Sequence, residues 1–480
     1  MKKFLSALLI IIMLLSTCVL LSCETDKGDD KDDNSSSSSS SRGEKTFEEE
    51  LLAIDNDKER AQRISNYSDD VCDGYSSYKL EMTILMVMNV QGTTAEMVGT
   101  MEEIRSDIGT DNFFYYTKDD MTVSVGGTKI STQSSTEFYK DGKHYINRGG
   151  ADGMTQKLCA SMSVSDFMAY LEKDESNFDE NDCTTVTCVL NDDKTWTVHY
   201  EGYTKSAIKI QLEELGIGED ELGADILDIK YTYKVDKDMN LISGKIEFVF
   251  DAEGEDAPVL ESEVERTGIN STKAKSVNTT DYTEVDSIVI IDEFEKKLEK
   301  IQDDVDGKFT LYIEQALSKG SQKQTNVETD EVSYGVRGGK YFYNAIADMG
   351  SAVYNVKYEN GYQTITSGAQ SQKNAQTEQE AKDFVNNLIN TCRYNADSIT
   401  GVTKNSDGSY DLITTNPDYS MAKALLTSWS AEVTYKGQIV TVKFADDGSI
   451  ESVESVLTIK GNCSNGDKCQ IVLKSVLTIK

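Results

Sequence analysis

The sequence predicts an α+β protein in which two tandem curved antiparallel β half-barrels, each with covering helices, follow a signal peptide and a disordered linker. Three observations predict this arrangement. An apolar N-terminal segment ends at a cysteine and is followed by a run of serines. Long stretches alternate apolar and polar residues, which is typical of strands with one buried face. The same order of motifs occurs twice along the chain, which indicates two copies of one domain.

The N-terminal segment 1–22 has the pattern of an export signal. Lys2 and Lys3 precede a long apolar run that ends at Leu-Leu-Ser, directly before Cys23. This pattern resembles the signal of bacterial lipoproteins, in which the cysteine is lipidated on sulfur and becomes the first residue after cleavage. An uncleaved membrane anchor is the alternative for the apolar run, and a cut before Cys18 is the poorer alternative for processing.

Residues 23–45 are expected to form a flexible tether. After Cys23 they are rich in Asp and Lys, contain seven serines from Ser35 to Ser41, and include no apolar residue. Such a segment has nothing to bury and stays disordered. A lipidated cysteine followed by this tether predicts a protein held by its lipid at the extracytoplasmic face of the cell membrane.

Composition limits the classes of partner. The formal net charge is −35, and it becomes −37 when Lys2 and Lys3 leave with the signal. This acidity excludes nucleic acid as the main partner and disfavours an anionic bilayer surface, because both attract clustered Lys and Arg. The chain has 33 glycines and two prolines, so Gly, Asn and Asp must make its turns.

The cysteines indicate at most a small disulfide framework. Of nine cysteines, Cys18 leaves with the signal and Cys23 is the lipidation site. Seven remain: Cys72, Cys159, Cys183, Cys188, Cys392, Cys463 and Cys469. An odd number leaves at least one thiol without an internal partner. Cys463 and Cys469 flank a hairpin-like loop, so we predict a disulfide between them and leave the other pairings open.

Each half of the chain begins with an amphipathic helix and an alternating strand. The first helix is expected to begin near Thr46 with the apolar residues Phe47, Leu51 and Ile54 on one face, and the strand 78–90 follows. The second half repeats both features with Phe294, Leu298 and Ile301 on the helix and Phe309, Leu311 and Ile313 on the strand.

Further matches keep the same order in both halves, and their offset shrinks steadily along the chain. The matching positions are Leu80 and Phe309, Asp141-Gly142 and Asn360-Gly361, Phe167 and Phe384, Ile208 and Leu425, and 234–238 and 443–447. If the matches had arisen by chance, their offsets would vary without order along the chain. We therefore predict two copies of one domain over residues 46–280 and 281–480.

The order of elements in each copy is a helix, hairpin-connected strands, a helix, one or two strands, a helix and a closing meander. This order, with the tyrosine-flanked Asp-Gly and Asn-Gly turns, resembles the LolA/LppX-like lipoprotein fold over most of 46–480. The resemblance implies a curved sheet whose concave side is covered by helices. It also implies a cavity that holds acyl chains or other hydrophobic ligands during transport through the envelope, although some relatives act as sensors.

Candidate ligand-binding residues are those expected on the inner face of the two sheets. They are Tyr78, Leu80, Met82, Ile84, Met86, Met88, Phe114, Phe309, Leu311, Ile313, Phe342 and Trp429. Methionine is flexible and polarisable, which suits a surface that adapts to variable apolar ligands. The alternative is that these residues simply pack as a core.

No motif for catalysis, a metal or a cofactor is found. The two histidines, His144 and His199, lie in alternating strand segments without a ligand pattern. Residues 236–247 have the carboxylate spacing of a calcium loop, but Leu241 stands where that loop needs glycine, so we expect a hairpin turn. We expect no enzymatic activity and no cofactor.

Together these features predict a membrane-anchored extracytoplasmic lipoprotein that binds a hydrophobic or amphipathic, lipid-like ligand in its half-barrel cavities. The alternative is a non-enzymatic envelope interaction or sensor module that binds another protein. The expected partners are the membrane through the N-terminal lipid, a lipid or other apolar ligand, and an envelope protein.

Overall fold

The computed structural model describes residues 46–90, 93–149, 155–172, 183–205, 207–208, 226–251, 258–303, 306–392, 394, 396–415, 417 and 419–480. The predicted signal 1–22, Cys23 and the linker to residue 45 lie outside this part of the chain. Two compact units are present. The first contains the described residues up to His144 and Met162–Asn278, and the second contains Tyr145–Ser161 and Thr279–Lys480.

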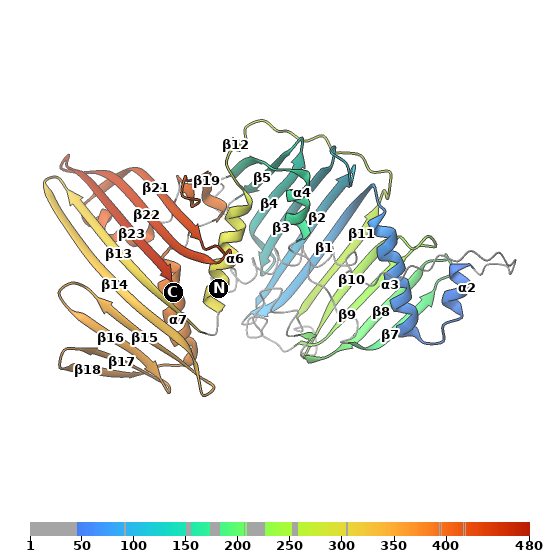
Figure 1. Cartoon of the computed structure of the whole chain (residues 1–480), viewed down its shortest axis with the longest axis horizontal. Coiled ribbons are helices and arrows are strands. Elements are labelled where there is room, and N and C mark those ends of the chain that lie inside the picture. Colours follow the sequence, from blue (N-terminus) through green and yellow to red (C-terminus); the bar gives the residue numbers. More distant parts are fainter. Residues whose placement is uncertain are drawn as a thin grey trace. The chain divides into compact units, whose positions relative to one another are not determined.

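The first sheet has twelve strands in the order β12-β6-β5-β4-β3-β2-β1-β11-β10-β9-β8-β7 (Figure 1). Their bounds are β1 Ser77–Val90, β2 Thr93–Ser106, β3 Phe114–Val125, β4 Thr128–Lys140, β5 Lys143–Gly149, β6 Thr155–Ser161, β7 Cys183–Leu190, β8 Trp196–Tyr203, β9 Ile226–Val235, β10 Leu241–Phe250, β11 Val259–Thr267 and β12 Thr283–Glu284.

The second sheet has eleven strands in the order β18-β17-β16-β15-β14-β13-β23-β22-β21-β20-β19. Their bounds are β13 Gly307–Lys319, β14 Gln322–Arg337, β15 Lys340–Asp348, β16 Val353–Glu359, β17 Tyr362–Ser367, β18 Gln370–Ala375, β19 Ile399–Lys404, β20 Tyr410–Thr414, β21 Ala431–Phe444, β22 Ile450–Cys463 and β23 Lys468–Ile479.

The two sheets have the same strand order once the short β12 is set aside. Aligning β1 with β13 places each later strand of the first sheet on a strand of the second, ending with β11 on β23. Neighbouring strands with a described register run antiparallel, except β12 and β6, and neither sheet closes on itself. The predicted fold class, two large open antiparallel sheets with few helices, is confirmed.

The helices whose full bounds lie within the described residues range from 6 residues in α2 to 17 in α3. They are α2 Phe47–Leu52, α3 Asp57–Asp73, α4 Val164–Glu172, α6 Val289–Asp303, α7 Glu378–Ile389 and α8 Ser420–Ser428, with 3₁₀ turns η4 Asn390–Cys392 and η5 Ala396–Ser398. Helix α2 begins after Thr46, whose side chain accepts from the Glu49 amide in a capping box. It ends at Leu52, before the predicted Ile54, and the longer α3 follows.

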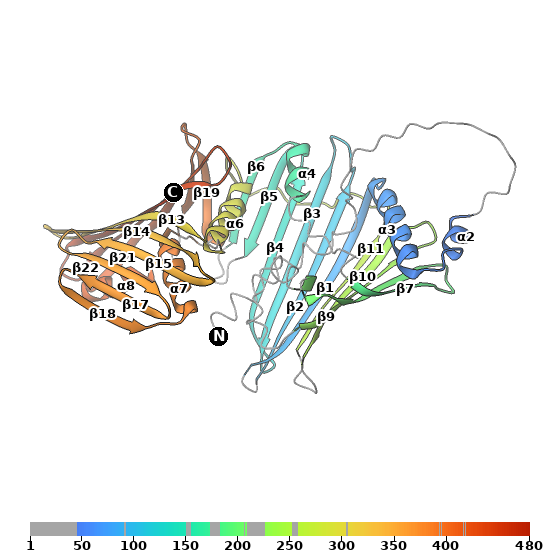
Figure 2. The same cartoon turned by 60° about the horizontal axis from the view of Figure 1, so that its bottom comes forward.

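Helices pack on the apolar faces of the sheets. Ala61 and Ile64 of α3 are buried in the core of the first unit, and Phe167 of α4 is fully buried against aromatic side chains. Figure 2 shows β1 to β6 side by side, with α4 beside them. In the second unit, Ala381 and Val385 of α7 are buried in the core.

The two matching turns have the geometry that two-residue hairpins need. Asp141 and Gly142 have φ values of 53° and 75°, and Asn360 and Gly361 have 55° and 81°. Positive φ at both central positions is the reason why Asn-Gly and Asp-Gly are favoured there.

The segment Tyr145–Ser161 contributes apolar residues to the core of the second unit. Ile146, Leu158 and Ala160 pack in one cluster with residues of α6 and β13. Buried Gln156 donates through Nε2 to the carbonyl oxygens of Ala396 at 3.0 Å and Ile399 at 2.7 Å. The second unit is thus built from two separate stretches of the chain.

Candidate functional site

The register of β1 and β2 defines a methionine-rich inner face in the first unit. Met82 pairs with Met101, Ile84 with Gly99, and Met86 with Met97. Side chains of directly paired residues on antiparallel strands lie on the same face of a sheet. Four thioethers are therefore brought to the same face around Ile84 and Gly99.

Strand β3 extends this face. Asp119 pairs with Met101, Met121 with Gly99, and Val123 with Met97. We call the following nine residues the methionine face: Met82, Ile84, Met86, Met97, Gly99, Met101, Asp119, Met121 and Val123. Its five methionines are buried, and the central Gly99 has no side chain, which leaves room for its neighbours to lie over it.

A buried ion pair lies at one end of the methionine face. Glu103 is 1% exposed, accepts a hydrogen bond from Arg105 Nε at 2.8 Å and lies 3.2 Å from the Tyr78 hydroxyl. The Arg105 guanidinium lies 5.6 Å from the ring centres of Tyr78 and Tyr115. Burial alone would lower the pKa of Arg105, but the neighbouring carboxylate raises it above its usual value. Glu103 and Arg105 are thus hydrogen-bonded to each other.

Asp119 has no such counter-ion. Its Oδ2 accepts a hydrogen bond from Ser135 Oγ at 3.2 Å, and no cationic partner is found for it among the described residues. Burial, together with the nearby Glu137 and Glu103 carboxylates, raises the pKa of Asp119 to about 6, although the Ser135 hydrogen bond opposes this shift. Lys118 pairs with Asp120 instead, on the opposite face of β3.

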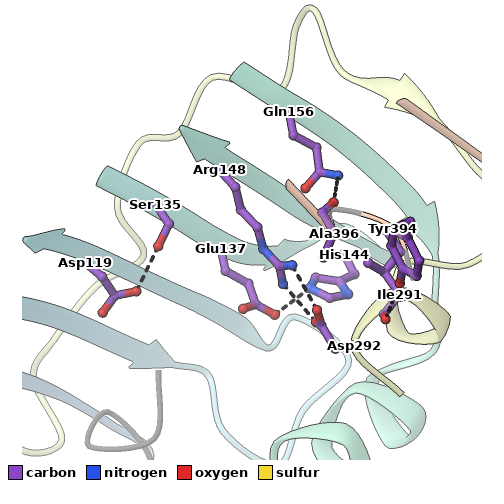
Figure 3. A network of polar contacts seen from close by, with 10 residues as sticks. All are labelled: Asp119, Ser135, Glu137, His144, Arg148, Gln156, Ile291, Asp292, Tyr394 and Ala396. Atoms are coloured by element: carbon purple, nitrogen blue, oxygen red, sulfur yellow. Dashed lines mark hydrogen bonds and ion pairs between the residues drawn. The ribbon is translucent and has the colours of Figure 1, made fainter. Parts of the chain in front are cut away.

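His144 is held in the aromatic cluster under α4. Its Nε2 lies 2.6 Å from Glu137 Oε1 (Figure 3). The centre of its ring lies 5.0 Å from that of Phe167 and 5.3 Å from that of Tyr170. His199 instead pairs its Nδ1 with Thr232 Oγ1 at 2.7 Å. Each histidine thus has a structural partner on or beside its own sheet.

The equivalent face of the second unit has a different character. Aligning Leu80 with Phe309 places Gln315 and Asn326 at the positions of Met86 and Met97. The Asn326 amide donates to Gln315 Oε1 at 3.2 Å, and Asn326 is exposed. At the position of Met101 stands Asp330, a buried carboxylate whose pKa burial raises to about 6.

The structure brings most of the predicted ligand-binding residues to the inner faces. The six on β1 are buried on one face, namely Tyr78, Leu80, Met82, Ile84, Met86 and Met88. Three lie in the corresponding row of β13, namely Phe309, Leu311 and Ile313. Trp429 follows α8 and packs in a cluster with Leu317 and Leu473.

Two predicted residues lie elsewhere. Phe114 pairs with Ser106, one position away from the inner pair Tyr115 and Arg105, so it lies on the opposite face. Phe342 pairs with Gly335 and is likewise on the opposite face from Tyr343. Phe114 and Phe342 were expected on the inner face, but a strand turns successive residues to alternate sides, and here their neighbours Tyr115 and Tyr343 are the inner residues.

Sequence reasoning missed six of the nine residues of the methionine face. Met97, Met101 and Met121 were not among the candidates, and neither was Asp119. A signal was present, because 95–102 alternates small or apolar residues with polar ones, with Val98 as the exception. Recognising that Met97 faces Met86, however, needs the register of β1 and β2.

The seven described cysteines are all buried, and each is present as a thiol. The thiols of Cys463 and Cys469 share a hydrogen bond, and burial, followed by the neighbouring Cys463, raises the pKa of Cys469. The pair is therefore adjacent, and the disulfide between Cys463 and Cys469 stays a prediction.

The calcium-like spacing forms a turn. Asp236 Oδ1 accepts hydrogen bonds from the backbone amides of Asp238 at 2.8 Å and Asn240 at 3.0 Å. These bonds close the hairpin between β9 and β10. Within the described residues, no group of three or more His, Cys, Asp and Glu side chains is placed to hold a metal ion. The helices of the same residues are all too short or too polar to cross a membrane.

Comparisons with known proteins add little. No protein-family model matches the chain, and no curated protein matches it. Solved structures with some likeness include an AttH-like protein from Nitrosomonas europaea, with 6% identity, coverage of 85% of this chain and 93% of that one, and a TM-score of 0.14. A porin-like protein from Bacteroides uniformis has 9% identity, coverage of 85% and 96%, and a TM-score of 0.10. These are distant likenesses to β-rich proteins, and at such scores they carry no functional information.

Proposed function

We propose that the protein is a membrane-anchored extracytoplasmic lipoprotein that binds a hydrophobic or amphipathic, lipid-like ligand against the inner face of its sheets. The observation that carries this proposal is the methionine face of the first unit. Five flexible thioether side chains, from Met82, Met86, Met97, Met101 and Met121, share one face of an open sheet.

The physical basis is that an open antiparallel sheet has one apolar face that something must cover. Leucine, isoleucine and valine make the most sharply defined cores, whereas methionine adapts to partners of varying shape. Methionine in place of the usual aliphatic residues suits an interior whose contents change. The resemblance to LolA/LppX-like lipoproteins supports the same use of the space between sheet and helices.

The proposal is tested by asking what the protein carries. Residues 46–480 are expressed in a lipid-containing host, purified without detergent, and examined by native mass spectrometry with organic extraction of bound molecules. We expect a lipid or other apolar molecule at a fixed ratio to protein. A mass equal to that of the bare chain, together with no uptake from added lipids, would favour the protein-interaction module instead.

The anchor has its own test. In the Cys23→Ser variant we expect a chain without lipid that is released from membranes. Serine keeps the size of the side chain but lacks the sulfur that is acylated. Membrane association that resists salt and alkaline washing in this variant would show that the apolar segment 4–21 is an uncleaved helix.

A further inference from the structure

The two sheets can be compared strand by strand because, apart from the short β12, they share one strand order. In the second unit, Asn326 is exposed, so the fold leaves this part of the inner face open to solvent. In the first unit the equivalent residue is Met97, which is 1% exposed. The shared topology therefore does not require an apolar residue here, and the methionine face is specific to the first unit.

Asp119 gives the methionine face a polar edge. It is half-buried beside Met101 on one side and Ser135 on the other. Arg105 is the nearby cation on the same face, and it is already paired with Glu103. The carboxylates of Glu103 and Glu137 both raise the pKa of Asp119, so the local field is negative. A positively charged group would complement this edge.

The apolar part of the face is long enough for an alkyl chain. Asp119 and Val123 are four residues apart on β3, about 14 Å along an antiparallel strand. Met121 lies between them on the same face, with Met97 and Met101 beside it on β2. Because these methionines are buried, a chain that enters at the half-buried Asp119 would have to repack them, and the three rotatable bonds of the methionine side chain make such repacking easier than for a branched residue.

We infer that the first unit, and not the second, binds an amphipathic ligand whose alkyl chain lies on the methionine face and whose cationic head group pairs with Asp119. This inference rests on the proposed function and narrows it to one unit and one ligand class. The predicted contacts combine apolar burial, which is not directional, with one charge-assisted interaction that sets the orientation.

The test uses the mature chain, residues 23–480, carrying Cys23→Ser so that it has no lipid of its own. Its affinity for dodecyltrimethylammonium and for dodecyl sulfate is measured by calorimetry below the micelle concentration. The two probes have the same dodecyl chain and differ in the sign of the charge on the head group. We expect the cationic probe to bind more tightly than the anionic one. Asp119→Asn should lower the affinity for the cationic probe about tenfold, which is the size expected for the loss of one charged hydrogen-bond partner.

Two controls separate this site from general attraction to an acidic protein. Asp330→Asn removes the same charge from a buried carboxylate on the inner face of the second unit, and it should leave the affinity unchanged. Met86→Gln and Met97→Asn introduce the residues that stand at these positions in the second unit. The double variant should have a lower affinity for both probes. Met97→Leu keeps the volume and apolarity, and near-ultraviolet circular dichroism checks that each variant is folded.

The outcomes are distinguishable. If the wild-type chain binds neither probe nor any offered lipid, the proposed function fails. If it binds them but Asp119→Asn has no effect, or Asp330→Asn has as large an effect, the assignment to this site is wrong while the carrier function stands. Equal loss with Met97→Leu and Met97→Asn would indicate that packing, and not a ligand surface, is being measured.

Discussion

Replacement of Asp119 by Asn should change how the stability of the protein depends on pH. The pKa of Asp119 in the folded protein is about 6, against 3.8 for an ordinary aspartate. Between these values the folded state binds more protons at this residue than the unfolded state does. The free energy of unfolding must therefore fall as the pH rises through this window.

The size of the effect follows from the two pKa values. A change from 3.8 to about 6 corresponds to at most about 3 kcal/mol of unfolding free energy. Asp119 is half-buried, and solvent screening reduces this to about 1–2 kcal/mol. The loss begins above about pH 4 and is complete above about pH 7.

The assay is urea unfolding at pH 4 and at pH 7, followed by near-ultraviolet circular dichroism. Between these pH values the wild type should lose about 1–2 kcal/mol more than Asp119→Asn. Asp120→Asn is the matched control, because the Lys118 hydrogen bond lowers the pKa of Asp120. That carboxylate stabilises the fold above its unfolded pKa, and its contribution is lost as the pH falls. Identical pH dependence in wild type and Asp119→Asn would refute the reasoning.

Three further predictions concern packing, polar contacts and the thiols. Phe167→Ala should lower the free energy of unfolding by about 3–5 kcal/mol, because this side chain of α4 is fully buried. Val189→Ala, at an exposed position, should lower it by less than about 0.5 kcal/mol, and thermal unfolding measures both. Gln156→Leu should lower the free energy of unfolding by about 1–3 kcal/mol, because the carbonyl groups of Ala396 and Ile399 lose their hydrogen-bond donor. Amide hydrogen exchange near residues 396–399 should become faster, and unchanged exchange would contradict this prediction. In a buffer that contains oxidised glutathione, Cys463 and Cys469 should form one disulfide, because the two thiols are adjacent. Peptide mapping without reductant should detect the two cysteines in one linked peptide, and alkylation of both thiols would exclude the disulfide.

Most of the fold could be predicted from the sequence, and the reason is visible in particular residues. Asp141-Gly142 and Asn360-Gly361 form turns with positive φ, a local property that the residue types demand. The alternation from Tyr78 onwards identifies β1 and its buried face, because burial on one side of a strand has a period of two. Repetition of these features then indicated two sheets of one kind.

The candidate site was predicted only in part, because it depends on contacts between strands. Met86 was recognised from its own strand, but its partner Met97 is set by the register with β2. Phe114 was expected on the inner face, whereas its pairing with Ser106 places it on the opposite face, and this pairing is not visible in the sequence. Asp119 was not predicted, because the chain has many acidic residues and the sequence does not distinguish Asp119 from Asp120. Only their surroundings do, since the pKa of Asp119 is raised and that of Asp120 is lowered.

The division of the second unit into two stretches has a consequence for the way the chain is made. Ile146, Leu158 and Ala160 leave the ribosome well before Thr279, where the rest of their unit begins. At about 5–20 residues per second, their packing partners arrive on the order of ten seconds later. During synthesis these apolar residues are therefore made before the core that buries them, and until that core is present they are exposed to aggregation or to binding by a chaperone.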